Sequence, residues 1–280
     1  MNPVVIIPCT GEPVAIETVK AALTQSPRVI VVGKIPAGLP GDERLTVIDA
    51  GQAVPPGRAR NLGVAAAPDA DVLVFLDADC VPQEGWLSKL LHKIEKGHEL
   101  VGGVLKPEGK GYCFLADQVT SFFDQLEGTK SGAVETLTAT NLTVTRSLWV
   151  RAGPFPEYVP ASEDIEFVLS CRRAGAIPFL EGAACVAHRP SPTDFRRLIA
   201  HASLWGAHSI GVRRRFADVL SLPFFLRSRL LLFFLAPLIG MAFAFYQLLH
   251  TPRPWRKFRL WPAMAIAKIV WCLSAAKSKR

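Results

Sequence analysis

Short apolar runs alternate with segments of helical periodicity over the first half of the chain. Four runs rich in β-branched or aliphatic residues are expected to be strands, at 4–7, 29–32, 45–48 and 73–76. The segments between them can form helices, most clearly 14–23 and the Ala-rich segment that begins at Arg58. Strands that alternate with helices in this way predict an α/β domain with a mostly parallel central sheet, covered on both faces.

Further elements follow the fourth strand. The periodicity predicts helices at 86–96 and 112–126, strands at 100–105 and 136–145, and a helix that starts at Glu163. A short apolar segment at 183–187 ends at His188. We find no internal repeat and no low-complexity stretch in the sequence.

The carboxyl third has a different pattern. Residues 230–249 carry no formal charge, and twenty residues of helix are long enough to cross a hydrocarbon core of about 30 Å. Pro237 and Gly240 interrupt this run, so a spanning helix, a hairpin and a re-entrant pair kinked at Pro237 all remain open, as does a buried soluble helix. A second, poorer apolar stretch at 260–276 contains Lys268. Basic residues on both sides leave the orientation undetermined.

Composition and charge agree with attachment to a membrane. Half of the residues are hydrophobic and the mean hydropathy is +0.26, which is high for a freely soluble protein. From Arg196 onward, fifteen Lys and Arg residues stand against the single acid Asp218, although the whole chain carries only +8. The basic C-terminal region therefore favours membrane lipids as a partner. Because the rest of the chain is acidic, we expect no nucleic acid partner.

The cysteines and the amino terminus indicate a reducing compartment. Six cysteines are scattered without a Cys-x-x-Cys pair, which argues against a zinc site or a disulfide framework. The first apolar run is short and has no basic residue before it, so it is expected to be a strand and not a signal peptide. We expect localisation at the cytoplasmic membrane, with the catalytic domain on the cytoplasmic face.

Two carboxylates follow the fourth strand directly. Asp77 and Asp79 are separated by one residue, and Pro82 ends the segment soon after them. In open α/β sheets, ligands bind at the carboxyl ends of the strands, and carboxylates there suit Mg²⁺ or Mn²⁺. The alternative is that both acids cap the helix near Glu84 or lie solvated in a turn.

An ordered set of motifs surrounds these acids. The set comprises Arg58–Gly63, Asp77-Ala78-Asp79, Gly153-Pro154-Phe155, Glu163-Asp164 and Arg172-Arg173-Ala174-Gly175. Together these motifs resemble family 2 glycosyltransferases over residues 4–188. The resemblance implies a Rossmann-like GT-A nucleotide-sugar-binding domain at 1–220, followed by C-terminal membrane-associated helices at 221–280. It also implies inverting transfer, dependent on Mn or Mg, from a nucleotide-sugar donor to a glycan or lipid-linked acceptor.

The resemblance assigns roles to particular residues. Asp79 and His188 are expected to bind the metal, although a lone His before Arg189 is also typical of a surface or capping residue. Asp164, at a helix amino terminus, is the expected general base unless it and Glu163 only cap that helix. The expected donor-binding residues are Pro8, Arg60, Asp77, Asn141 and Glu163, and Arg60 has Asp49 and Asp69 as alternative ion-pair partners.

One departure from the family pattern concerns the donor base. Family members commonly end the second strand with Asp-Asp-Gly, whose first acid contacts the nucleobase, but here Gly33-Lys34 follows Val32. Either Asp49 replaces that acid or the base preference differs from uracil.

The alternative function is a membrane-anchored module that keeps the fold without catalysis. A nucleotidyltransferase is disfavoured because Pro8 to Glu12 makes a poor phosphate loop.

Overall fold

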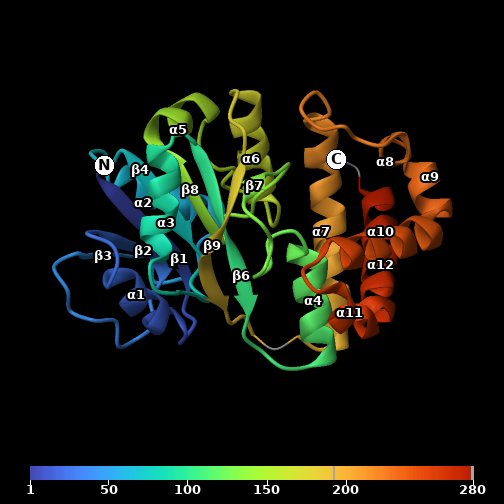
Figure 1. Cartoon of the computed structure of the whole chain (residues 1–280), viewed down its shortest axis with the longest axis horizontal. Helices are drawn as coiled ribbons and strands as arrows, with labels where there is room; N and C mark the ends of the chain where they lie inside the picture. The colour runs from blue at the N-terminus through green and yellow to red at the C-terminus, as the bar shows by residue number, and fades with distance from the viewer. Residues whose placement is uncertain (192, 279–280) are drawn as a thin grey trace. The chain divides into compact units, whose positions relative to one another are not determined.

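The structure, a computed structural model, describes residues 1–191 and 193–278 and forms two compact units (Figure 1). The first unit comprises Met1–Lys106, Lys130–Val159 and Glu163–Pro190. The second comprises Pro107–Thr129, Pro160–Ser162 and the described part of Ser191–Arg280. The helices at 112–122 and 195–215 therefore group with the C-terminal helices, whereas the sequence suggested a boundary near residue 220. The functional division at that residue stays a prediction.

A mixed sheet forms the centre of the first unit. Its order is β3-β2-β1-β4-β8-β6-β9-β5, with β7 beside β9. The described strands are β1 (Pro3–Thr10), β2 (Val29–Lys34), β3 (Leu45–Asp49), β4 (Val72–Leu76), β5 (Cys80–Pro82), β6 (Leu100–Pro107), β7 (Gly132–Ala133), β8 (Asn141–Thr145) and β9 (Phe179–His188). Strands β1 to β4 are parallel, as predicted, and β8 runs antiparallel to both β4 and β6.

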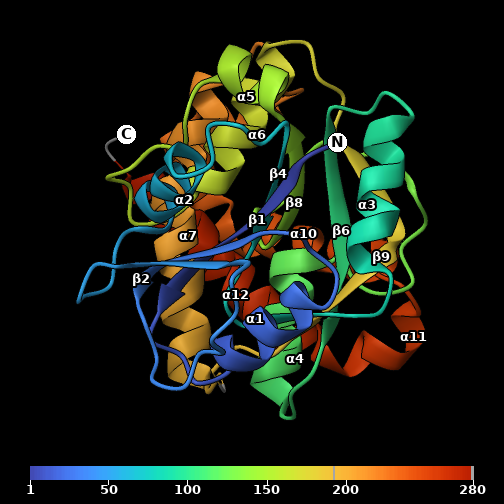
Figure 2. The same cartoon turned by 90° about the vertical axis from the view of Figure 1, so that its left-hand side faces the viewer.

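Helices cover both faces of this sheet (Figure 2). They are α1 (Ala15–Leu23), α2 (Pro56–Ala65), α3 (Trp86–Glu95), α5 (Arg146–Ala152) and α6 (Glu163–Arg173). Successive side chains of a strand point to opposite faces, so Ile6, Ile30 and Phe75 face one side and share a core with α2, α5 and α6. Helices α1 and α3 lie on the other face. The central strands are apolar throughout because they are covered on both sides.

Helix α2 is held very close to its neighbours. A Cβ on Gly57 would lie 2.1 Å from the carbonyl oxygen of Pro156, and one on Gly63 would lie 2.4 Å from Cγ2 of Ile6. Asn61 fixes the same helix to the Gly-Pro-Phe-Pro turn, because its amide donates to the Phe155 carbonyl and accepts from the Phe155 N–H, at 2.9 and 3.0 Å. The middle of α2, which carries Arg60, is therefore rigidly positioned.

The predicted elements agree with the structure except near two ends. The strand expected over 136–145 begins only at Asn141, and residues 136–140 approach it as an irregular segment. The helix expected over 112–126 ends at Phe122.

The second unit is helical. Its described helices are α4 (Tyr112–Phe122), α7 (Phe195–Arg215), α8 (Phe224–Arg227), α9 (Arg229–Phe234), α10 (Ala236–His250), α11 (Pro254–Lys257) and α12 (Trp261–Lys277), with a short 3₁₀ turn at Phe258–Leu260. Helix α12 packs closely against α7 and α10. A Cβ on Gly206 of α7 would lie 2.3 Å from the Trp271 carbonyl oxygen, and one on Gly240 of α10 would lie 2.6 Å from the Ile269 nitrogen.

The uncharged run at 230–249 does not form one helix. Helix α9 ends at Phe234, and α10 begins at Ala236 with Pro237 in its first turn, where a missing N–H costs nothing. The fifteen residues of α10 extend about 22 Å, which is less than a hydrocarbon core of about 30 Å. A single spanning helix over 230–249 is therefore wrong, because the run breaks at Leu235, and how these two helices meet a membrane stays a prediction.

Candidate active site at the carboxyl edge of the sheet

Asp77 and Asp79 lie in a tight turn between β4 and β5. The Cys80 N–H donates to the Asp77 carbonyl oxygen at 3.0 Å, and the Asp77 N–H donates to the Thr140 carbonyl oxygen at 3.2 Å. Strand β5 then pairs antiparallel with β9, so that Cys80 stands opposite His188. Both acids are thus at the sheet edge that the sequence predicted, and they are fixed by backbone hydrogen bonds on both sides.

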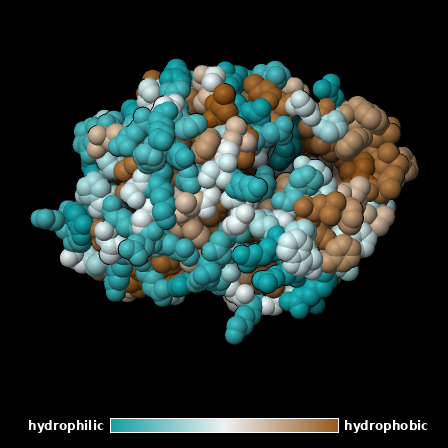
Figure 3. Space-filling model, in the orientation of Figure 1, coloured by the Kyte–Doolittle hydropathy of each residue, from teal (hydrophilic) through white to brown (hydrophobic). Residues whose placement is uncertain are grey.

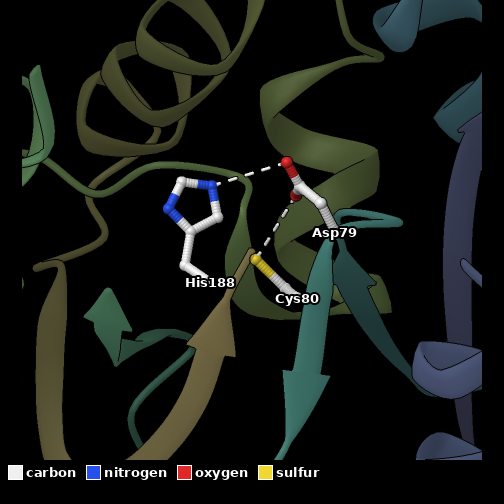
Figure 4. Close-up of side chains that lie close together, drawn as sticks. All are labelled: Asp79, Cys80 and His188. Carbon is white, nitrogen blue, oxygen red and sulfur yellow. Dashed lines mark hydrogen bonds and ion pairs between the residues drawn. The ribbon is translucent and has the colours of Figure 1, made fainter. Parts of the chain in front are cut away.

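Asp79, Cys80 and His188 bring three possible metal ligands together (Figure 4). His188 Nε2 lies 3.6 Å from Asp79 Oδ2, and Cys80 Sγ lies 3.7 Å from Asp79 Oδ1. The ligand atoms of all three residues lie within 4.8 Å of one another. A carboxylate and an imidazole at this separation fit a divalent cation such as Mn²⁺. The two residues expected to bind the metal are therefore neighbours in space, although their role stays a prediction.

Arg60 joins the turn to helix α6. Its guanidinium donates to Asp77 Oδ1 at 2.7 Å and to Glu163 Oε1 at 2.8 Å, and it lies over the ring of Phe155. The side chain is only 3% exposed, and its Nε has no hydrogen-bond partner among the described residues. These are not the partners considered from the sequence: Asp49 accepts from the Gly51 N–H, and Asp69 pairs with Arg28.

Three carboxyl groups surround this one guanidinium. Burial raises the pKa of Asp164 to about 7, the charge on Glu163 adds to this rise, and Arg60 opposes it. Burial also raises the pKa of Asp77, again against the effect of Arg60. The cluster has more negative than positive groups, so it favours either a bound proton or a nearby cation.

Asp164 occupies the first turn of α6. It is 7% exposed, and its Oδ1 accepts the N–H of Ile165 at 2.7 Å. Ser162, the residue directly before α6, has a left-handed φ of 72°, a conformation that costs a non-glycine residue about 1–3 kcal/mol. Backbone strain thus accompanies the carboxyl-rich start of α6.

The other expected donor-binding residues lie at different depths. Pro8 is half-buried near the end of β1. Asn141 is buried in β8, where its amide accepts from the Trp86 indole N–H and donates to the carbonyl oxygens of Val104 and Ala184. The side chain of Asn141 is therefore used within the fold, and the donor-binding roles of both residues stay predictions.

Two residues in this region were not identified from the sequence. Asn61 clamps the Phe155 turn, and Cys80 places its sulfur beside Asp79. Cys80 can be recognised as a possible metal ligand only from the strand pairing, because the register of β5 and β9 places it opposite His188.

Comparisons with known proteins agree with this architecture. Residues 4–114 match the family model described as glycosyl transferase family 2. The glycosyltransferase AglE of Haloferax volcanii is 28% identical over 172 residues, which are 57% of this chain and 54% of that protein. The chain thus spans about half the length of the curated relative.

Two solved structures resemble the whole chain. The mannosyltransferase PcManGT from Pyrobaculum calidifontis, in complex with GDP-Man and Mn²⁺, has a TM-score of 0.60 at 16% identity, covering 100% of this chain and 88% of that one. TarS 1–349 of S. aureus has a TM-score of 0.54 at 16% identity, covering 99% of this chain and 90% of that one. At this identity the likeness concerns the fold.

The first prediction concerns the buried cation. Arg60→Ala leaves buried carboxylates without their counter-charge, so the free energy of unfolding should fall by about 3–5 kcal/mol at pH 8. Loss of the guanidinium raises the pKa values of Asp77 and Asp164 further in the folded protein. A carboxyl whose pKa is raised in the folded state favours the folded protein at low pH, and this contribution is lost as the pH rises. The loss of unfolding free energy caused by Arg60→Ala should therefore be smaller at pH 5 than at pH 8.

Urea unfolding at the two pH values measures this difference. The exposed pair of Arg151 with Glu99 provides the control, and Arg151→Ala should change stability little at either pH. An equal loss at both pH values for Arg60→Ala would show that packing, not charge, explains the effect.

Proposed function

We propose that this chain, a family 2 glycosyltransferase with the GT-A fold, transfers a sugar from a nucleotide-sugar donor to an acceptor hydroxyl with inversion at the anomeric carbon. One observation carries the proposal: a buried, acid-rich cluster around Arg60 shares the turn at Asp77–Cys80 with a pair of metal-type ligands. Such a turn combines groups for handling a diphosphate with a candidate base for the acceptor proton.

Asp79 and His188 are the residues proposed to hold a divalent cation. Such a cation would supply positive charge beside the diphosphate as it leaves the sugar. The cluster around Arg60 is already rich in carboxylates, so binding a diphosphate there requires added positive charge. We infer Mn²⁺ or Mg²⁺, and the complex of PcManGT with Mn²⁺ and GDP-Man supports this choice.

Asp164 is the proposed general base. A carboxylate with its ordinary pKa is a weak base, whereas a pKa of about 7 brings its basicity close to the working pH. In this role Asp164 accepts the proton of the acceptor hydroxyl while that oxygen attacks the anomeric carbon. Arg60 holds Glu163 and Asp77 in position, so the start of α6 stays beside the turn.

Asp49 is the proposed substitute for the missing nucleobase acid. It ends β3 in register with Gly33 of β2, so its exposed carboxylate stands beside the position at which similar enzymes carry an acid. Gly33 itself is constrained, with φ of 128° and a Cβ position 2.2 Å from the Cys9 carbonyl oxygen. No side chain fits at position 33 of β2. The carboxylate would instead come from Asp49 of the neighbouring strand β3.

We further propose that the second unit binds a membrane surface and that the acceptor is membrane-proximal, either lipid-linked or a glycan. The supporting observation is a contiguous apolar surface on α9 and α10, visible as brown atoms in Figure 3. Leu230, Phe234 and Leu238 are 71%, 74% and 63% exposed. Basic residues flank these helices at Arg227, Arg229, Arg253, Arg256, Lys257 and Arg259, which suits anionic lipid headgroups.

Helix α12 is a weaker candidate for membrane contact. Within the described residues, the helical segment Pro254–Lys277, which comprises α11, the 3₁₀ turn and α12, is the one candidate long and apolar enough to cross a membrane by length and composition. However, 44% of its most apolar window is buried in the protein. Lys268 on this helix donates to the Thr120 carbonyl oxygen at 3.2 Å and lies 4.9 Å from the Phe243 ring centre. These contacts favour α12 as the core of the helical unit and α9 with α10 as the membrane-facing part.

The second prediction tests the cation. Asp79→Ala should abolish sugar transfer, and excess chelator should do the same to the wild-type chain. Asp69→Ala, which changes an exposed carboxylate in an ion pair with Arg28, serves as the control and should keep transfer. Full activity of Asp79→Ala, or undiminished transfer in chelator, would contradict a metal-dependent reaction.

The third prediction tests the base. Asp164→Asn keeps the size of the side chain and its acceptor oxygen but removes its basicity, so kcat should fall at least about 10²-fold while donor affinity persists. In the wild-type chain kcat should rise with pH and level off above about 7, because only the ionised carboxylate accepts a proton. Parallel loss of donor affinity and rate would instead indicate a structural role.

The fourth prediction tests the membrane surface. Flotation with vesicles that contain anionic phospholipid should carry the full chain, and the double change Phe234→Glu and Leu238→Glu should weaken binding at least about tenfold. Val150 is also apolar and 72% exposed, but it lies on α5 of the first unit, so Val150→Glu should bind vesicles normally. Unchanged flotation of the double variant would exclude α9 and α10 as the contact.

A further inference from the structure

Cys80 is held at the proposed metal site by sheet pairing. It begins β5 and stands directly opposite His188 of β9 in an antiparallel ladder. Opposed residues of such a pair project to the same face of the sheet, with Cβ atoms about 4.5–5.5 Å apart. The backbone therefore directs the thiol and the imidazole to one place, and Asp79 adjoins them in sequence.

The environment of Cys80 differs from that of Cys171 and Cys185. Cys171 and Cys185 are packed in the apolar core, where a thiol behaves as a small hydrophobic group. Cys80 is fully buried too, but its sulfur lies 3.7 Å from a carboxylate oxygen. In Figure 4 dashed lines join both the sulfur and the imidazole to the Asp79 carboxylate.

The distances suit coordination of one ion. Zinc-type bonds of about 2.0–2.3 Å in a tetrahedral arrangement separate ligand atoms by about 3.3–3.8 Å. His188 Nε2 lies 3.6 Å from Asp79 Oδ2, and Cys80 Sγ lies 3.7 Å from the other carboxylate oxygen, Oδ1. With one ligand atom taken from each residue, no pair exceeds 4.8 Å. Small side-chain rotations would bring all three atoms to bonding distance.

We propose that Asp79, Cys80 and His188 together form a three-ligand O/S/N site that binds thiophilic divalent ions, of which Zn²⁺ and Co²⁺ are examples, more tightly than Mn²⁺ or Mg²⁺. This inference rests on the proposed function, because it adds a ligand to the same metal site. A thiolate is a soft ligand, which raises affinity for Zn²⁺ and Co²⁺ but contributes little to Mg²⁺. On binding, a metal–sulfur bond forms and the thiol proton passes to solvent, with no change of oxidation state.

The site would then discriminate between metals. The Cys80 thiolate and the Asp79 carboxylate would together balance the double charge of a divalent ion, with the His188 imidazole as the third ligand. Zn²⁺ should therefore displace Mn²⁺ from this site.

Titration of the full chain with Co²⁺ tests the sulfur ligand directly. Wild-type protein should develop the near-ultraviolet charge-transfer absorption of a Co–thiolate bond. Cys80→Ser should lose that absorption, and Asp79→Asn and His188→Ala should weaken or remove it. Cys113→Ser changes a partly exposed cysteine of α4 and should keep the absorption. Thermal unfolding of each variant checks that it is folded, and Cys80→Ala is a second substitution should the serine variant fail to fold.

Competition provides the second measurement. Zn²⁺ should displace bound Mn²⁺ from the wild-type chain, and Cys80→Ser should weaken Zn²⁺ affinity at least about tenfold while Mn²⁺ affinity changes little. A wild-type chain that binds Co²⁺ without the charge-transfer band, or a Cys80→Ser variant with unchanged Zn²⁺ affinity, would overturn the sulfur ligand. Mn²⁺-dependent transfer would then still support the proposed function. Absence of any metal binding would overturn both.

Discussion

The buried guanidinium of Arg60 is the interaction on which the rest of the site depends. It bridges Asp77, in the turn after β4, to Glu163, in the first turn of α6, with both hydrogen bonds below 3 Å. The two acids are far apart in sequence, and without the cation they would repel each other and Asp164. The close packing of Gly57 against Pro156 keeps α2 where its Arg60 can reach both acids. The packing of α2 therefore determines the position of Arg60, and Arg60 in turn holds Asp77 and Glu163 together.

The same cluster divides the chemistry between two rigid elements. One positive group cannot neutralise three carboxyls, so the remaining negative charge must be met by a proton or a cation. The raised pKa of Asp164 corresponds to the first solution, on helix α6. Asp79 and His188, the residues proposed to bind a cation, correspond to the second, in the turn before β5 and at the end of β9. Asp164 belongs to a helix, His188 belongs to a paired strand, and backbone hydrogen bonds fix the turn that carries Asp79, so their geometry can be maintained without substrate.

The sequence predicts the parts of this arrangement that depend on local order. The apolar runs predict strands β1 to β4, and because Asp77 and Asp79 follow one of them directly, their place at the sheet edge follows too. Long-range pairings are not predictable in this way. Arg60 binds Glu163, which lies 103 residues away, whereas nearer acids were the apparent candidates. Cys80 has no Cys-x-x-Cys spacing to mark it as a metal ligand, and its partner His188 becomes a neighbour only through strand register.

The C-terminal helices show why hydropathy alone does not identify a membrane contact. A hydropathy window measures composition, but burial depends on which helices pack together. Helix α12 is apolar because it fills the centre of the helical unit, and its one buried lysine is satisfied by a carbonyl of α4. The break at Leu235 leaves α9 and α10 too short to span a bilayer separately, yet it leaves their apolar side chains exposed. An exposed apolar surface between basic flanks is most stable at a lipid interface, which is why we propose that these helices lie along a membrane surface instead of crossing it.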